Sequence, residues 1–198
     1  MIIKLSPVRS DISLQVFKSG EMLTVNNVAF DFSRLAEGST LPAEAAGSEY
    51  IVAPVERVNG ELVLTLKLPH AADAPESARF PNDIHQSADG PVRLPGLEVG
   101  EIEQATAGVI DWSQEVTAEM KQAAAAAELL ASVQAETARL RKIADDAIAP
   151  LQDAMDLGEA TAEEGAALTA WKRYRVALNR LPDQAGYPGE ITWPELPA

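Results

Sequence analysis

The sequence predicts an α+β protein in which a sheet-forming first half is followed by a helical second half. Three observations predict this class. Apolar and polar residues alternate over much of residues 1–97, as in strands with one buried face. No proline or glycine interrupts residues 113–149, where apolar residues recur at steps of four and three. Pro150, Gly158 and the late prolines then divide the remainder into shorter elements.

Tight turns separate the expected strands of the N-terminal domain. Asn59-Gly60 is the preferred residue pair for a type I′ hairpin turn. The strand that follows it places one apolar face toward a core, through Leu62, Leu64, Leu66 and Leu68. We therefore expect a small antiparallel β-sandwich or rolled sheet over residues 1–97, followed by a linker over residues 98–112.

A single long helix is expected over residues 113–149. Ser113 can cap its start, and Pro150 marks its end because proline disfavours helix in the residue before it. The heptad seam consists of Ala126, Leu130, Val133, Thr137, Leu140, Ala144, Ala147 and Leu151. This spacing favours a coiled coil, with self-association along the seam or docking on a partner. The alternative is an alanine-rich linker helix that is bare to solvent at its N-terminal end.

Residues 150–198 predict a helical hairpin followed by a proline-rich extended tail. Pro150 suits the first turn of a short helix, and Gly158 suits the position after its last turn. Thr161 and Glu164 form the capping-box pattern that begins a longer second helix. The later prolines stop that helix and keep the tail extended.

The second arm of this hairpin and the tail contain the candidate partner-binding residues. They are Trp171, Tyr174, Arg175, Leu178 and Trp193. Tryptophan, tyrosine and arginine are enriched at protein–protein hot spots, which favours docking. The same side chains can instead pack as core against the short helix. A basic, aromatic helix can also bind nucleic acid, but the net charge of −14 makes a phosphate backbone a poor ligand, so no nucleic-acid partner is expected.

Motifs for catalysis, cofactors and metals are missing from the sequence. It contains no G-x-G-x-x-G or P-loop pattern, no nucleophile elbow and no cysteine. His70 and His85, with Asp73 and Asp83 nearby, lie in a loop-rich region that gives no rigid metal-ligand spacing. No apolar run approaches the ~20 residues of a membrane span. We expect no enzyme activity, no cofactor or metal, no small-molecule substrate and no membrane partner.

Four motifs follow one another near the C-terminus. They are "PLQDAMDLG" at residues 150–158, "AT-x-EE" at 160–164, "L-x-AWKRYRV-x-LNR" at 168–180 and "I-x-WP" at 191–194. Their order resembles the C-terminal region of the tail fibre assembly proteins, or fibre chaperones, of tailed bacteriophages. Residues 1–97 instead resemble small uncharacterised phage proteins from tail-fibre regions, which imply no activity.

The resemblance implies a non-catalytic chaperone that binds the distal part of a trimeric tail fibre and assists its folding or trimerisation. Such a protein acts in the host cell cytoplasm during assembly, with retention on the virion tail fibre as a further outcome. The N-terminal sheet would pair with fibre strands by edge addition. The alternative is a structural virion component at the fibre tip or baseplate that contacts the host surface. A nucleic-acid-binding regulator is the least favoured reading.

Overall fold

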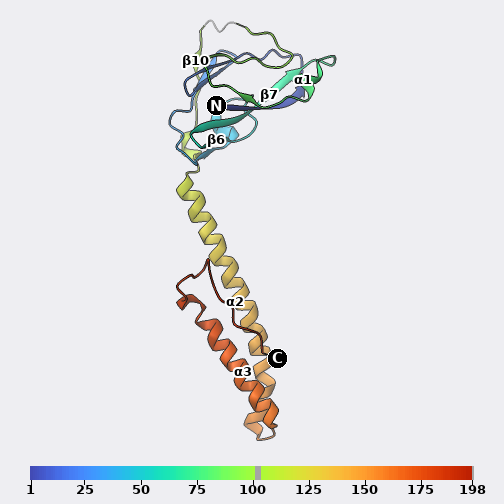
Figure 1. Cartoon of the computed structure of the whole chain (residues 1–198), viewed down its shortest axis with the longest axis vertical. Helices are drawn as coiled ribbons and strands as arrows, with labels where there is room; N and C mark the ends of the chain where they lie inside the picture. The colour runs from blue at the N-terminus through green and yellow to red at the C-terminus, as the bar shows by residue number, and fades with distance from the viewer. Residues whose placement is uncertain (101–103, 198) are drawn as a thin grey trace. The chain divides into compact units, whose positions relative to one another are not determined.

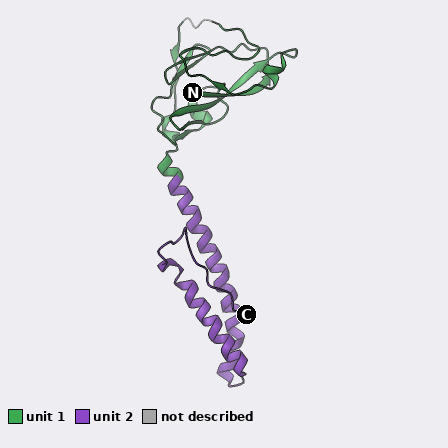
Figure 2. Cartoon of the chain, viewed as in Figure 1, with its two compact units in different colours: residues 1–121 green, residues 122–198 purple. Residues whose placement is uncertain are grey.

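The computed structural model describes residues 1–100 and 104–197, and it confirms the α+β class. The chain divides into two compact units, Met1–Lys121 (unit 1) and Gln122–Ala198 (unit 2), which Figure 2 colours separately. The strands that the structure describes all lie in unit 1 (Figure 1). The predicted linker over residues 98–112 falls within unit 1, and its residues 101–103 lie outside the described residues.

The first sheet of unit 1 has five strands in the order β5-β6-β7-β1-β8. Their bounds are β1 Ile2–Arg9, β5 Thr40–Leu41, β6 Val55–Val58, β7 Glu61–His70 and β8 Ile84–His85. The predicted hairpin at Asn59-Gly60 joins β6 to β7, and both turn residues have positive φ, 52° and 79°. β1, however, pairs with β7 in parallel, so the expected antiparallel sheet is wrong here. No tight turn joins these two strands, so no turn residue in the sequence indicates their direction.

The second sheet has the order β10-β4-β3-β2-β9. Its strands are β2 Val16–Ser19, β3 Met22–Val25, β4 Val28–Asp31, β9 Gly90–Pro91 and β10 Thr106–Ala107. β2, β3 and β4 form an antiparallel meander, with Asn26 and Asn27 at positive φ in the second turn. β10 runs parallel to β4, so this sheet is mixed as well.

Both sheets of unit 1 contribute to one hydrophobic core. The leucine face of β7 is buried as predicted, and it shares this core with residues of the second sheet. Members from both sheets include Ile3, Leu23, Val25, Phe30, Leu62, Leu64, Leu66 and Leu68. Short helices in the connections are η1 Ala43–Ala46, α1 Glu76–Arg79 and η2 Trp112–Gln114.

Each sheet ends in strands of only two residues: β5 and β8 in the first, β9 and β10 in the second. The outer side of β5 is already occupied, because Thr40 exchanges backbone hydrogen bonds of 2.9 and 2.8 Å with Val116. Very short edges are how sheets avoid pairing with other strands. β8, however, pairs only with Ile2 and Ile3 of β1, so residues 4–9 of β1 have no strand partner on that side among the described residues. Pairing of the N-terminal sheet with fibre strands stays a prediction.

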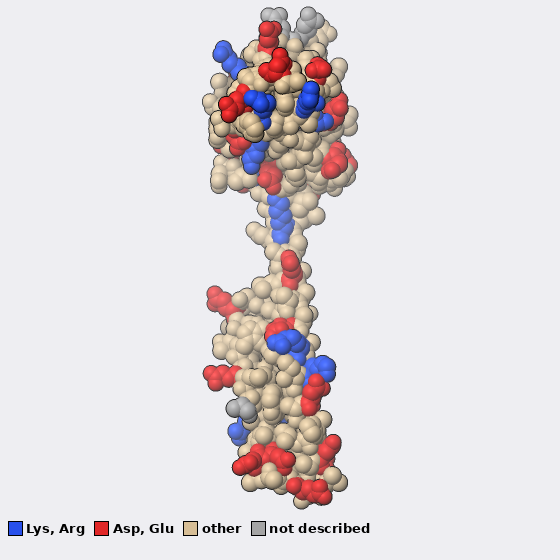
Figure 3. Space-filling view, turned by 90° about the vertical axis from the view of Figure 1, so that its right-hand side faces the viewer, with Lys and Arg blue, Asp and Glu red and all other residues tan. Residues whose placement is uncertain are grey.

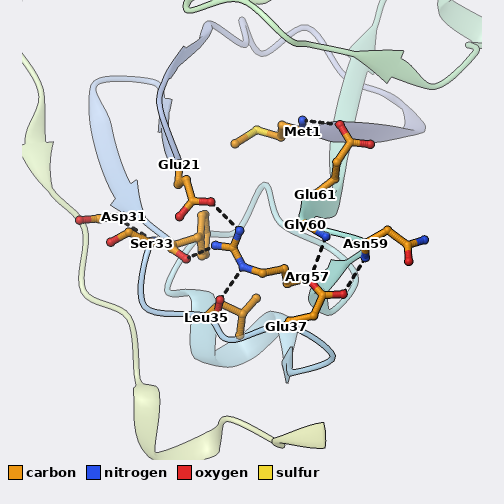
Figure 4. Close-up of polar contacts among 11 residues, drawn as sticks. Met1, Glu21, Asp31, Ser33, Leu35, Glu37, Arg57, Asn59, Gly60 and Glu61 are labelled. Atoms are coloured by element: carbon orange, nitrogen blue, oxygen red, sulfur yellow. Dashed lines mark hydrogen bonds and ion pairs between the residues drawn. The ribbon is translucent and has the colours of Figure 1, made fainter.

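Arg57 connects the two sheets through one polar network (Figure 4). It lies on β6, and its guanidinium donates hydrogen bonds to the carbonyl oxygens of Leu35, at 2.6 Å, and Phe32, at 3.3 Å. It also forms an ion pair with Glu21 in the turn between β2 and β3. The hydrogen bond from Arg57 lowers the pKa of Glu21, and the same bond raises the pKa of Arg57. This side chain therefore holds both a loop and the neighbouring sheet against β6.

The turn at Asn59-Gly60 is held by a second carboxylate, that of Glu37 (Figure 4). Its two oxygens accept hydrogen bonds from the backbone nitrogens of Asn59, at 2.7 Å, and Gly60, at 2.9 Å. Asp31 accepts a hydrogen bond of 2.9 Å from the backbone nitrogen of Ser33, which lowers the pKa of Asp31. Both carboxylates thus stabilise turns of unit 1.

The long helix α2 spans Ala118–Leu157 and differs from its prediction at both ends. Ser113 lies in η2 rather than at the helix start, and the predicted short helix after Pro150 is the last part of α2. Proline removes one backbone hydrogen bond and crowds one carbonyl group. Pro150 itself is exposed while Ile148 nearby is buried, so the buried face of the helix continues past it.

The second helix of unit 2, α3, spans Ala162–Asn179 and lies beside the C-terminal part of α2 (Figure 1). Gly158, at φ 74°, ends α2, and the predicted capping box begins α3. The Thr161 hydroxyl accepts a hydrogen bond of 3.2 Å from the backbone nitrogen of Glu164, whose carboxylate accepts one of 2.7 Å from the backbone nitrogen of Thr161. The short helix η3, Leu181–Asp183, follows α3.

Loss of this cap should weaken the hairpin measurably. Thr161→Ala leaves a backbone N–H at the start of α3 without its acceptor, which we expect to cost about 0.5–2 kcal/mol of unfolding free energy. Chemical denaturation followed by the helical circular dichroism signal measures this loss. Thr161→Ser keeps the hydroxyl and should unfold close to wild type. Equal midpoints for Thr161→Ala and wild type would contradict a stabilising cap.

Candidate docking surfaces

A small aromatic core holds α3, the end of α2 and the tail together within unit 2. Its buried members are Ala144, Tyr174, Leu178 and Leu181, and Leu140, Trp171, Tyr187 and Trp193 pack against them. The rings of Trp171 and Tyr174 meet edge to face, with centroids 5.9 Å apart. Burial raises the pKa of the Tyr174 hydroxyl. Tyr187 and Trp193 thus attach the tail to this core.

The five predicted partner-binding residues divide by their exposure. Tyr174 and Leu178 are 5% and 0% exposed, so the structure places both in the core of unit 2. Trp171 and Trp193 are half-buried against that core and keep part of their surface accessible. Arg175 forms an ion pair of 2.7 Å with Asp145 on α2, and its side chain is 41% exposed. The sequence allowed core packing as an alternative to partner binding, and Tyr174 and Leu178 are core residues. Partner binding by Trp171, Arg175 and Trp193 stays a prediction.

A different face of α3 forms a groove of about 710 Å³, called here the basic groove. It is lined by Thr169, Lys172, Arg173, Val176, Ala177, Arg180, Asp183 and Gln184. Val176 is 45% exposed and contributes apolar surface to the groove. The groove combines apolar residues with positively charged ones, a lining that suits a protein segment.

Over residues 1–100 and 104–197, the cations of the basic groove lack the ion pairs that most other cations of unit 2 form. Arg139, Lys142 and Arg175 each form an ion pair with a carboxylate. Within the groove, Lys172 donates a hydrogen bond to the Gln152 amide oxygen, and Arg173 has no side-chain partner among the described residues. The same holds for Arg180 in the part of the chain that the structure describes. On the face seen in Figure 3, acidic and basic side chains are interspersed.

The heptad seam of α2 is covered along only part of its length. Val133 and Ala144 are buried and Leu140 packs against the core of unit 2, whereas Ala126 and Leu130 upstream are exposed. Every residue from 119 to 132 is exposed. The N-terminal part of α2 thus has the bare surface that the linker-helix alternative predicts, and self-association along it stays a prediction.

The next candidates are metal sites and membrane-spanning helices. Among the described residues, no group of three or more histidine, cysteine, aspartate or glutamate side chains could hold a metal ion. His70 and His85, for which the sequence predicts no metal site, lie on β7 and β8 of the first sheet. No helix in residues 1–100 and 104–197 is both long enough and apolar enough to cross a membrane.

Comparison with known proteins identifies the family. The family model described as "Caudovirales tail fibre assembly protein, lambda gpK" matches residues 82–198, more than half of the chain. The chain belongs to this tail fibre assembly protein family. The match covers all of unit 2 together with the last part of unit 1, and it confirms the resemblance seen in the C-terminal motifs.

Curated relatives of this tail fibre assembly protein match over shorter stretches. The "Probable tail fiber assembly protein" of Acyrthosiphon pisum secondary endosymbiont phage 1 is 49% identical over 70 residues, which are 35% of this chain and 44% of the relative. The "Tail fiber assembly protein" of Escherichia phage lambda is 53% identical over 58 residues, 29% of each chain. The chain thus spans less than half the length of these relatives. No solved structure matches it.

Sequence reasoning missed the basic groove of this family member, although its signal was present. The periodicity that buries Leu168, Tyr174 and Leu178 leaves Arg173 and Val176 on another side of α3. The predicted binding surface instead includes the aromatic side of α3, because tryptophan and tyrosine are common both in cores and at interfaces.

Proposed function

We propose that this tail fibre assembly protein is a non-catalytic chaperone that binds the distal part of a phage tail fibre and assists its folding or trimerisation. The observation that carries the proposal is the family match over residues 82–198. A trimeric fibre exposes apolar surface and unpaired strand edges before it closes, and these surfaces favour aggregation. A protein that binds the unassembled fibre chain in the host cell cytoplasm reduces that aggregation by mass action.

Unit 2 is the part that we assign to fibre binding. It lies wholly within the family match and contains its own core. Trp171, Arg175 and Trp193 keep accessible surface around that core, and Tyr174 and Leu178 fix their positions from inside.

Co-expression with the tail fibre of the same phage tests the proposal. We expect soluble fibre trimers, counted by size-exclusion chromatography with light scattering, to form in the presence of this protein and aggregates to dominate without it. A matched control expresses the fibre with unit 1 intact but with Leu178 replaced by aspartate, which disrupts the core of unit 2. Equal trimer yields with and without the wild-type protein would refute the chaperone role.

A further inference from the structure

The basic groove is lined by two arginines and by two apolar residues between them in the sequence. Arg173, Val176 and Ala177 are spaced at i, i+3 and i+4 on α3, and Arg180, at i+7, is the capping residue that follows the helix. Seven residues of helix rise about 10.5 Å, so the two arginine Cα atoms are about that far apart along the helix axis. Lys172 adds a third positive charge to the lining.

These cations are available to a partner. Neither arginine has a side-chain hydrogen bond or ion pair within the described residues, although the chain as a whole has a net charge of −14. A carboxylate that entered the groove would form charge-assisted hydrogen bonds with a guanidinium group, which are stronger than hydrogen bonds between neutral groups. An apolar side chain seated on Val176 would remove exposed apolar surface from water.

We propose that the basic groove binds an extended acidic segment of the tail fibre, with an apolar side chain on Val176 between acidic side chains that pair with Arg173 and Arg180. Alternate side chains of an extended strand share one face, so an acidic, an apolar and an acidic side chain that all face the groove require about five residues, which rise about 13 Å. The long arginine side chains can reach over this distance. The volume of about 710 Å³ accommodates such a segment. This proposal rests on the proposed function, because it names the chemistry by which the fibre is recognised.

The chemistry of the groove favours a peptide over nucleic acid. Asp183 also lines the groove, so its lining is not uniformly basic. A phosphate backbone carries a regular series of negative charges and no apolar side chain to cover Val176. A peptide can combine one or two carboxylates with an apolar side chain, so the groove fits a protein segment better.

Charge reversal in the full-length protein tests the groove. We expect the double variant Arg173→Glu, Arg180→Glu to bind the purified tail fibre of the same phage at least tenfold more weakly than wild type at low salt. The dissociation constant is measured by isothermal titration calorimetry. Wild-type binding should weaken as salt rises, and the double variant should lose most of that salt dependence.

Two matched controls separate the groove from general charge effects. Arg141 on α2 is exposed, has no side-chain partner among the described residues and lies outside the groove, so Arg141→Glu should bind like wild type. Val176→Asp keeps both arginines but replaces the apolar side chain, and it should also weaken binding. Helical circular dichroism of each variant establishes that α3 is intact, as expected for exposed side chains without internal partners.

The outcomes distinguish this inference from the function on which it rests. If wild type binds the fibre and the double reversal binds equally well, the groove proposal is wrong and the chaperone proposal stands. If wild type does not bind the fibre at all, both are wrong. If duplex DNA competes with the fibre for wild type, the groove binds phosphate and the assignment to an acidic peptide is overturned.

Discussion

Leu178→Ala is expected to lower the unfolding free energy of the helical hairpin by about 2–5 kcal/mol. Leu178 has no exposed surface and packs in the core of unit 2, so its truncation removes apolar contacts and leaves a cavity. In a small core every such contact is a large share of the total. The loss should appear as an earlier denaturant midpoint of the helical signal.

Val176→Ala is the matched control, because it shortens an exposed apolar side chain on the same helix. Its stability should change by no more than about 0.5 kcal/mol. Fibre binding then separates the two kinds of role. Val176→Ala should bind the fibre more weakly at nearly wild-type stability if the basic groove is the contact, whereas Leu178→Ala should lose stability first. A Leu178→Ala variant as stable as wild type would mean that the core of unit 2 is not packed as described.

Arg57→Met should destabilise unit 1 by about 1.5–3 kcal/mol, the range for hydrogen bonds to charged groups. The substitution keeps an apolar stem of similar length but removes the bonds to Leu35, Phe32 and Glu21. Its guanidinium side chain is only 11% exposed, so water replaces these bonds poorly. Arg93→Met, at an exposed position of unit 1, is the control and should leave the midpoint unchanged.

The same ion pair gives unit 1 a defined pH dependence. Arg57 holds the pKa of Glu21 below its ordinary value of 4.5, so the folded protein favours the ionised carboxylate. The resulting stabilisation is present above pH 4.5 and is lost as the pH falls through the lower folded value. Glu21→Gln should remove this part of the acid dependence of the midpoint. An unchanged acid profile would show that the ion pair does not contribute in solution.

Turn chemistry made the hairpins of unit 1 predictable, and strand direction without a turn did not. Asn59-Gly60 and Asn26-Asn27 are residues that accept positive φ, so each indicated a tight connection between neighbouring strands. β1 meets β7 only after most of the sheet-forming sequence has passed between them. Such a pairing depends on how the whole core closes, which no local residue pattern records.

The helical half shows a second limit of local rules. Proline is a strong local signal for a helix boundary, but the buried face on either side of Pro150 keeps α2 continuous. Likewise, the aromatic residues of α3 were found from composition, while their division between core and surface depended on where α2 and the tail pack. Residue type indicated which side chains matter, and packing decided what each does.

The bare part of α2, residues 119–132, has a consequence for how the chain opens. Its side chains are exposed, and beyond Lys121 its helical state depends largely on intrinsic propensity. Its five consecutive alanines are the strongest helix formers available. A helix segment of this length is only marginally stable in water on its own. Backbone hydrogen exchange and proteolytic cleavage should therefore begin in this alanine segment, while the cores of the two units, on either side of it in the sequence, remain protected.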